Sequence, residues 1–334
     1  MKRAERLLER VGDPENLRFA VWKAAKGKRY SQAVLVYSRH LETNLSRLRE
    51  QILSGNVEVG QYRYFKVYEP KERQICASAF GEQVLHHALM NVCHDHFEQA
   101  QIFDSYASRT GKGTYAAIDR AKVFTRSHKW FLKLDVRKFF ESIHHDVLKN
   151  QLSQIFKDKR LLAIFDKVID SYAAHPERGL PIGNLTSQYF ANHYLAGLDH
   201  FIKERLRIKS YVRYMDDMVL WHSDKAELQK ARGDIRHFVE TKLRCELKPE
   251  ALNRAATGLP FLGYHIFPHH IRLLQKSKQR FIKKMRLVDE NYHSGTWCEA
   301  KCQRHALPLL AFASHADTQR LKENLLLHLK GQSP

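Results

Sequence analysis

No stretch of this chain is apolar for long enough to cross a membrane. Its 334 residues are 43% hydrophobic, yet no run approaches the roughly 20 apolar residues that a membrane-spanning helix requires. The charged first six residues are followed only by short apolar pairs, so a secretory signal is not expected either. The sequence therefore predicts a cytoplasmic protein without a membrane partner.

Cysteine is scarce, which argues against a disulfide framework. The chain has an odd, scattered set of five, which we expect to be reduced thiols: Cys76, Cys93, Cys245, Cys298 and Cys302. Cys298 and Cys302 lie four positions apart with His305 beyond them, a spacing that allows a metal site. However, a fourth ligand is missing, and the same spacing fits one face of a helix equally well.

Acidic residues are in short supply too. Lys and Arg total 56 against 36 Asp and Glu, which gives a formal net charge of +20. An excess of this size indicates a polyanionic partner. Because no apolar run is long enough to enter a membrane, nucleic acid is favoured over an anionic membrane.

A Walker phosphate-binding loop is also absent. The basic, glycine-containing residues 108–114 lack its spacing, so Arg109 and Lys112 are predicted to contact a nucleic-acid backbone. That stretch leads into an apolar helix expected from Tyr115 onward.

A second basic stretch has the periodicity of a helix. Residues 272–286 carry seven Lys or Arg in fifteen positions together with an apolar face. Lys276, Arg280 and Lys284 are predicted to follow a nucleic-acid backbone, although a solvated charged face gives the same pattern.

The most informative stretch runs from Ser210 to Trp221. Two runs of strand-forming residues flank Asp216 and Asp217, which predicts a tight hairpin with both carboxylates at its tip. Adjacent carboxylates repel each other, and Mg²⁺, a hard ion that prefers oxygen ligands, is the cation expected beside them. Taken alone, such a pair is more often just a turn.

A third aspartate ends another predicted strand. Residues 130–136 are largely apolar, and a carboxylate at Asp135 is costly unless it is exposed or bound to a metal ion. Residues 137–143 are expected to continue into a turn and a helix. Asp135 is therefore the natural third ligand.

Residues 179–188 form a predicted loop in front of a helix. Two glycines and a proline restrict its backbone, and Asn184 or Thr186 can cap the helix behind it. That helix is expected to bury a stripe made of Phe190, Tyr194, Leu198 and Ile202. The loop can therefore present its backbone to a nucleotide base, although glycine turns before helices are common.

Periodicity and turn residues predict the remaining elements. Residues 1–60 are expected to be helical, with the last helix closed by residues 54–56. Further helices are expected at 82–91, at 225–243 and in the C-terminal region. Strands are expected at 62–68, 73–77, 259–266 and 270–274. At the mouth of the first hairpin, Lys71 and Arg73 could grip a triphosphate or be solvated.

Three of these segments resemble, in order, the palm motifs of reverse transcriptases. They are Leu-Asp-x-x-x-Phe-Phe-x-Ser-Ile at 134–143, Gly-Leu-Pro-Ile-Gly-Asn-Leu-Thr-Ser-Gln at 179–188, and Tyr-Met-Asp-Asp at 214–217. The likeness extends from about Tyr62 to Tyr264. It implies an RNA-directed DNA polymerase that binds an RNA template, a cDNA or primer strand and deoxynucleoside triphosphates.

The resemblance also implies an α+β right-hand polymerase with fingers, an antiparallel-sheet palm and a helical thumb. The predicted boundaries are 1–60 for an N-terminal helical extension, 61–128 for the fingers, 129–265 for the palm and 266–334 for the thumb. No endonuclease or RNase H segment is expected after the thumb.

Phosphoryl transfer to a primer hydroxyl benefits from two divalent ions about 4 Å apart. By resemblance, Asp135 and Asp216 would bridge two Mg²⁺ ions, Asp217 would support the ion nearer the primer, and the Val136 carbonyl would complete the other site. The nucleotide site is assigned to six residues: Lys71, Arg73, Phe140, Ile182, Gln188 and Lys248. Among these, Phe140 matches the family's steric gate against a 2′-hydroxyl, although it could be ordinary core.

Within that family, the loop at 179–188 and the fragments at 67–71 and 261–264 look most like the reverse transcriptases of diversity-generating retroelements. This likeness implies a bacterial or phage-encoded enzyme, errors at template adenines, and a small basic accessory variability protein as an oligomeric partner. Where many relatives carry glutamine, this loop has Ile182, which predicts low fidelity.

Other function classes remain open on the sequence. A retron, group II intron-like or defence-associated reverse transcriptase would keep the same palm. A non-catalytic RNA-binding protein would explain the charge of +20, but it would not need three aspartates in these contexts.

Overall fold

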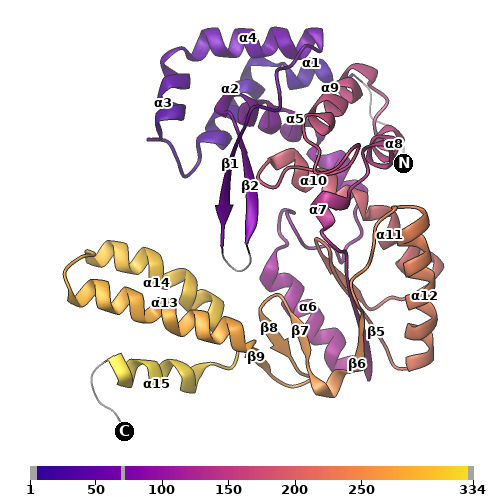
Figure 1. Ribbon diagram of the computed structural model, residues 1–334, viewed down its shortest axis with the longest axis vertical. Coiled ribbons are helices and arrows are strands. Elements are labelled where there is room, and N and C mark those ends of the chain that lie inside the picture. The colour runs from indigo at the N-terminus through magenta and orange to yellow at the C-terminus, as the bar shows by residue number, and fades with distance from the viewer. Residues whose placement is uncertain (1–5, 69–71, 330–334) are drawn as a thin grey trace. The chain divides into compact units, whose positions relative to one another are not determined.

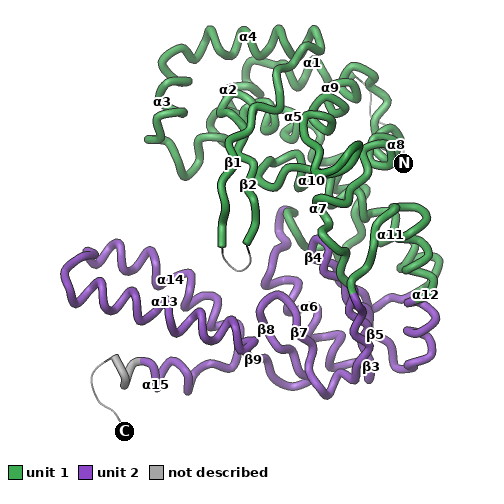
Figure 2. The backbone as a smooth tube through the Cα atoms, in the orientation of Figure 1, with its two compact units in different colours: residues 1–109, 135–207, 233–248 green, residues 110–134, 208–232, 249–334 purple. Residues whose placement is uncertain are grey.

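The structure, a computed structural model, describes residues 6–68 and 72–329. The chain divides into two compact units, each assembled from separate segments (Figure 2). Unit 1 comprises residues 1–109, 135–207 and 233–248, and unit 2 comprises residues 110–134, 208–232 and 249–334. The boundaries predicted for fingers, palm and thumb stay predictions.

Unit 1 begins with four helices, as predicted for this region (Figure 1). They are α1 (Leu8–Val11), α2 (Pro14–Ala25), α3 (Gln32–Arg39) and α4 (Leu41–Ser54). The side chain of Asp13 accepts hydrogen bonds from the first-turn amides of α2, which explains where that helix starts. Gly55, at φ +74°, ends α4 in the left-handed conformation where the sequence predicts a stop.

The predicted first hairpin is confirmed. Strands β1 (Tyr62–Val67) and β2 (Arg73–Ser78) pair antiparallel, with Tyr62 opposite Ser78. Helix α5 (Phe80–Gln99) follows and buries apolar residues along much of its length, which makes it the central helix of this unit. Lys71 lies outside the described residues.

The rest of unit 1 is helical. Its elements are α7 (Phe139–Ser142), α8 (His145–Ile155), α9 (Lys159–Asp170), α10 (Leu185–Tyr194), α11 (Ala196–His200) and a π-helical turn (Phe201–Arg205). The prediction of one continuous helix after residue 184 was wrong, because a turn at Leu195 separates α10 from α11 and the chain then widens into the π turn, where the Leu206 amide donates to the Phe201 carbonyl. The predicted stripe of Phe190, Tyr194, Leu198 and Ile202 is nevertheless completely buried. Residues four positions apart stay on about the same face in both the α-helix and the π turn.

Unit 2 contains a four-stranded sheet with strand order β4-β5-β3-β6. The strands are β3 (Trp130–Asp135), whose last residue belongs to unit 1, β4 (Tyr211–Tyr214), β5 (Asp217–His222) and β6 (Ala251–Arg254). The pairs β4–β5 and β3–β6 are antiparallel. Helix α6 (Thr114–Ser127) bonds to this sheet where the Trp221 indole donates to Thr125 Oγ1 at 3.1 Å.

The prediction of a single strand at residues 259–266 was wrong. The segment forms a hairpin, β7 (Leu259–Phe261) and β8 (Tyr264–Ile266), and β8 also pairs with the predicted partner β9 (Ile271–Leu273). Leu262 and Gly263 both have positive φ, +47° and +91°, the signature of a tight hairpin turn. Sequence analysis missed the turn because leucine rarely adopts that conformation.

The predicted C-terminal helices are present in unit 2. They are α13 (Gln275–His293), α14 (Glu299–Ser314) and α15 (Gln319–Leu329). A small core holds them together, with Phe281, Ala313 and Leu325 buried at its centre. Helix α12 (Lys225–Thr241) starts in unit 2 and ends in unit 1.

All five cysteines are free, and Cys298 is the exposed one among them. Across the part of the chain that the structure describes, no helix combines the length and the apolar character needed to cross a membrane.

Candidate active site

The Asp216–Asp217 pair lies at a hairpin, as the sequence predicts. Tyr214 pairs with Asp217 across β4 and β5, so Met215 and Asp216 form the turn and Asp217 starts β5. Met215 has φ +54°, and the fully buried Arg213 donates from Nη1 to the Met215 carbonyl at 3.1 Å. A buried guanidinium bonded to the turn backbone stabilises this unusual conformation.

Lys133 is a site residue that sequence analysis missed. It lies on β3, the neighbour of β5, and its Nζ is 3.2 Å from Asp217 Oδ2 and 2.7 Å from the Pro260 carbonyl. A lysine inside an otherwise apolar strand was the signal that could have revealed it. Its ammonium offsets negative charge at the hairpin, where two adjacent carboxylates repel each other.

Asp135 has a lysine of its own within unit 1. Lys248 Nζ lies 2.7 Å from Asp135 Oδ1, and the Lys248 amide donates to the Asp135 carbonyl at 2.8 Å. A bridge between Val136 and Leu247 holds the two segments side by side. Lys248 was predicted as a nucleotide contact, and the structure pairs its ammonium with the predicted catalytic carboxylate.

The segment after Asp135 is bonded to the glycine loop. The Leu180 amide donates to the Phe140 carbonyl, and the Gly179 amide donates to the Ile143 carbonyl, both at 2.8 Å. Phe139 is buried, whereas Phe140 is only partly buried. Two of the three sequence motifs are therefore joined by backbone hydrogen bonds inside unit 1.

The same loop lies against strand β2. The Cys76 amide donates to the Ile182 carbonyl at 2.8 Å. Gly183 has φ +134°, and a Cβ at that position would lie 2.7 Å from the Cys76 carbonyl oxygen. Only glycine fits there without displacing the backbone. The partly exposed Ile182 side chain is therefore held on a well-defined backbone.

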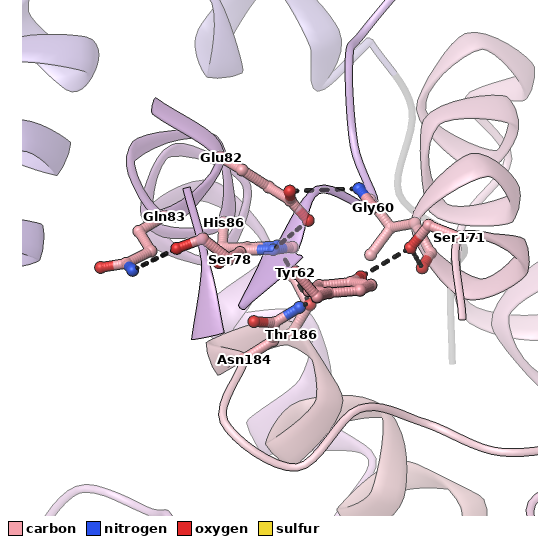
Figure 3. Close-up of polar contacts among 10 residues, drawn as sticks. Gly60, Tyr62, Ser78, Glu82, Gln83, His86, Ser171, Asn184 and Thr186 are labelled. Atoms are coloured by element: carbon pink, nitrogen blue, oxygen red, sulfur yellow. Dashed lines mark hydrogen bonds and ion pairs between the residues drawn. The ribbon is translucent and has the colours of Figure 1, made fainter. Parts of the chain in front are cut away.

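A buried polar network lies behind the loop (Figure 3). Thr186 Oγ1 is 3.1 Å from His86 Nδ1, His86 Nε2 is 3.4 Å from Glu82 Oε1, and the Gly60 amide donates to Glu82 Oε2 at 3.1 Å. Glu82, His86 and Thr186 are all buried. The network fixes the start of α10 against α5, and sequence analysis did not predict it because Thr186 lies 100 positions after His86.

The predicted capping role of Asn184 or Thr186 was wrong. Asn184 occupies the N-cap position of α10, but its side chain makes no capping bond and donates instead to the Tyr62 hydroxyl at 3.4 Å. That hydroxyl is also 2.8 Å from Ser171 Oγ. Burial raises the pKa of Tyr62 to about 12, so the hydroxyl keeps its proton near neutral pH.

Three other predicted contacts also lie in unit 1. Arg73 is exposed at the start of β2, and Gln188 is exposed and accepts from Ser108 Oγ at 3.1 Å. The Arg109 side chain is 9% exposed and is held by Glu98 at 2.9 Å and by two backbone carbonyls. We therefore leave Arg109 out of the proposed nucleic-acid contacts, since its guanidinium stabilises a loop.

The other predicted cations lie in unit 2. Lys112 is partly exposed in the loop before α6. On α13, Lys276 is exposed and Arg280 and Lys284 are partly exposed, at four-residue spacing. Because Phe281 on the same helix is buried in the C-terminal core, α13 combines an anchored apolar face with a basic one.

Within residues 6–68 and 72–329, no group of three or more His, Cys, Asp or Glu side chains is arranged to hold a metal ion. The metal site considered at Cys298, Cys302 and His305 therefore does not form. Mg²⁺ commonly keeps several waters and binds one or two carboxylates together with substrate phosphates. The carboxylates of Asp135 and of the Asp216–Asp217 turn are oxygen donors of the kind that this ion prefers.

Comparison with known proteins agrees with this interpretation of the motifs. The profile of the family described as "Reverse transcriptase (RNA-dependent DNA polymerase)" matches residues 70–266, which include all three aspartates. Protein YkfC of Escherichia coli is 24% identical over 79% of this chain and 83% of its own length. The putative COX1/OXI3 intron 1 protein of Saccharomyces cerevisiae is 20% identical over 49% of this chain but only 21% of its own length.

Solved structures with a similar fold include telomerases of Candida tropicalis. The apo enzyme truncated from its C-terminal domain has a TM-score of 0.51 at 12% identity, covering 70% of this chain and 60% of that one. The complex with a TWJ fragment of telomeric RNA has a TM-score of 0.50 at 11% identity, covering 88% and 59%. At such identities the likeness concerns the fold, and it confirms the predicted α+β right-hand polymerase class.

Proposed function

Because the chain belongs to the reverse transcriptase family of RNA-dependent DNA polymerases, we propose that it copies an RNA template into cDNA. The observation that carries this proposal is the Asp216–Asp217 turn at the start of β5, together with Asp135 at the end of the neighbouring strand β3. The substrates would be deoxynucleoside triphosphates and a primer strand. The charge of +20 suits both nucleic-acid partners.

Asp135, Asp216 and Asp217 are proposed to hold two Mg²⁺ ions, with the Val136 carbonyl as a further ligand. When bound, the ions would lower the pKa of the primer 3′-hydroxyl and stabilise charge on the triphosphate. Before the substrate binds, Lys133 and Lys248 would offset the negative charge of the carboxylates. Lys133 contacts Asp217 Oδ2, and Lys248 contacts Asp135 Oδ1.

The nucleotide site would be formed by the glycine loop and the segment after Asp135. The backbone bond between Leu180 and Phe140 couples the two segments, so the partly exposed side chains of Phe140 and Ile182 would be held against the same nucleotide. Phe140 would exclude a 2′-hydroxyl by steric contact. Arg73 and Gln188 are exposed and available for further contacts.

We propose in addition that the enzyme serves a diversity-generating retroelement and makes errors at template adenines with a small basic accessory protein. This proposal rests on the form of the loop at 179–188, where Ile182 supplies only apolar contact. A retron, group II intron-like or defence-associated enzyme is the alternative. The similarity to the putative COX1/OXI3 intron 1 protein favours the group II intron-like enzyme among these. A near-duplicate repeat pair beside the gene, differing at adenines, would support the retroelement.

The Asp216→Asn/Asp217→Asn double variant tests the catalytic proposal. RNA-templated primer extension should fall by on the order of 10³-fold or more, because the carboxylate charge that would bind the metal ions is removed. Folding and RNA binding should be retained, and Glu227→Gln, an exposed acid of the same unit, should behave as wild type. Near-normal extension by the double variant would refute the assignment, and wild type that binds RNA without extending it would indicate a non-catalytic RNA-binding protein.

A further inference from the structure

Helix α2 has an inverted distribution of side chains. Its buried face carries one large residue, Leu17, and three alanines, Ala20, Ala24 and Ala25, and packs on α5. The two large aromatic side chains of the helix, Phe19 and Trp22, are instead 48% and 50% exposed. Large apolar rings normally gain most from burial. Core packing therefore does not explain why this helix has aromatic residues at these positions.

The two rings form an ordered platform. Their centroids are 5.7 Å apart and their planes differ by only 9°. The Lys23 ammonium lies 4.6 Å from the Phe19 centroid and is held there by Asn91 at 2.7 Å. Lys23 covers one face of Phe19, and the remaining ring faces of the parallel pair are held in place, so that a further ring can stack on them at little cost in conformational entropy.

The segment that carries the platform is basic, although its Arg18 is paired with Glu42. From Pro14 to Tyr30 the sequence has five cations and one acid. Lys26 and Arg29 are exposed beside an almost fully exposed Tyr30. These residues precede the segment that matches the reverse transcriptase family, which begins at residue 70.

We infer that α2 and the loop after it form a binding surface for single-stranded RNA, on which bases stack against Phe19 and Trp22 while Lys26 and Arg29 contact phosphates. Aromatic rings interleaved with cations suit single strands, whose bases expose their faces. A second copy of the chain, or a basic protein, would bring like charges together and is disfavoured. The choice of RNA rests on the proposed function, whereas the stacking geometry does not.

Fluorescence anisotropy of the full chain with a labelled, unstructured single-stranded RNA tests this inference. The Phe19→Leu/Trp22→Leu variant keeps apolar volume but loses both aromatic faces, and its affinity should fall about tenfold or more. The Leu35→Ala/Val36→Ala variant is the matched control, because it truncates two exposed aliphatic side chains on the next helix and should bind as wild type. Affinity for double-stranded RNA, whose base faces are covered, should not change.

The charge contribution has a separate readout. In Lys26→Gln/Arg29→Gln, the slope of log affinity against log salt concentration should decrease by about 0.7 for each phosphate that the variant no longer neutralises. Unchanged single-strand affinity in the leucine variant would overturn the inference. The inference would also be overturned if the loss of Phe19 and Trp22 weakened binding to anionic phospholipid vesicles but left binding to RNA unchanged. Because the assay measures binding and not synthesis, an inactive polymerase would leave this result interpretable.

Discussion

Gly183 offers a sharp test of how the fold shapes the site. Its φ of +134° is a conformation that L-residues rarely adopt, and a Cβ would lie 2.7 Å from the Cys76 carbonyl oxygen. In Gly183→Ala we expect backbone strain of about 1–3 kcal/mol. If the loop moves away to relieve the close approach, the hydrogen bond between the Cys76 amide and the Ile182 carbonyl breaks, at a further cost of about 1 kcal/mol.

The matched control is Gly55→Ala. Gly55 also has positive φ, +74°, but no atom lies within 4 Å of a Cβ built there. In this variant the free energy of unfolding should decrease only by the cost of placing alanine in the left-handed conformation, about 1–2 kcal/mol. Alanine would therefore be conformationally strained at both positions, but only at position 183 would its Cβ also come too close to a neighbouring strand.

Urea unfolding and primer extension would separate the two effects. The free energy of unfolding should decrease by about 2–4 kcal/mol in Gly183→Ala and by less in Gly55→Ala. Under conditions where both variants are folded, kcat/KM for the nucleotide should fall only in Gly183→Ala, because its loop carries Ile182. Equal losses of stability and activity in the two variants would refute the proposed coupling between strand β2 and the nucleotide loop.

Three further predictions concern single side chains. Phe140→Ala should admit ribonucleotides more readily while deoxynucleotide use falls much less, and an unchanged ratio in primer extension would mean that the steric gate lies elsewhere. Wild type should misincorporate opposite template adenines and Ile182→Gln should reduce these errors severalfold, since one contact is worth about 1 kcal/mol; identical cDNA error spectra would exclude Ile182. Burial, reinforced by the charge of Lys23, lowers the pKa of His87 from 6.5 to about 4. The neutral ring is therefore favoured in the fold, so the free energy of unfolding should decrease as pH falls from 6.5 to 4, and His87→Gln should weaken this dependence in urea titrations.

The extended hairpins show where sequence reasoning succeeds. Alternating strand formers around Asp216 and Asp217 predicted β4 and β5 closely, because a two-residue turn between apolar strands is a local property. The hairpin at β7 and β8 was missed for an equally local reason. Its turn contains Leu262 at φ +47°, a conformation that leucine rarely adopts and that the sequence therefore does not predict.

Taken by itself, the sequence determined many of the elements, the excess of positive charge and the three aspartates, since each follows from short-range pattern and composition. Only the tertiary structure decided which lysine accompanies which aspartate, because Lys248 reaches Asp135 from 113 positions away. It alone placed Thr186 beside His86, and it turned Asn184 from a predicted cap into a partner of Tyr62. Such contacts depend on segments far apart in the chain being packed together, and no local pattern records that packing.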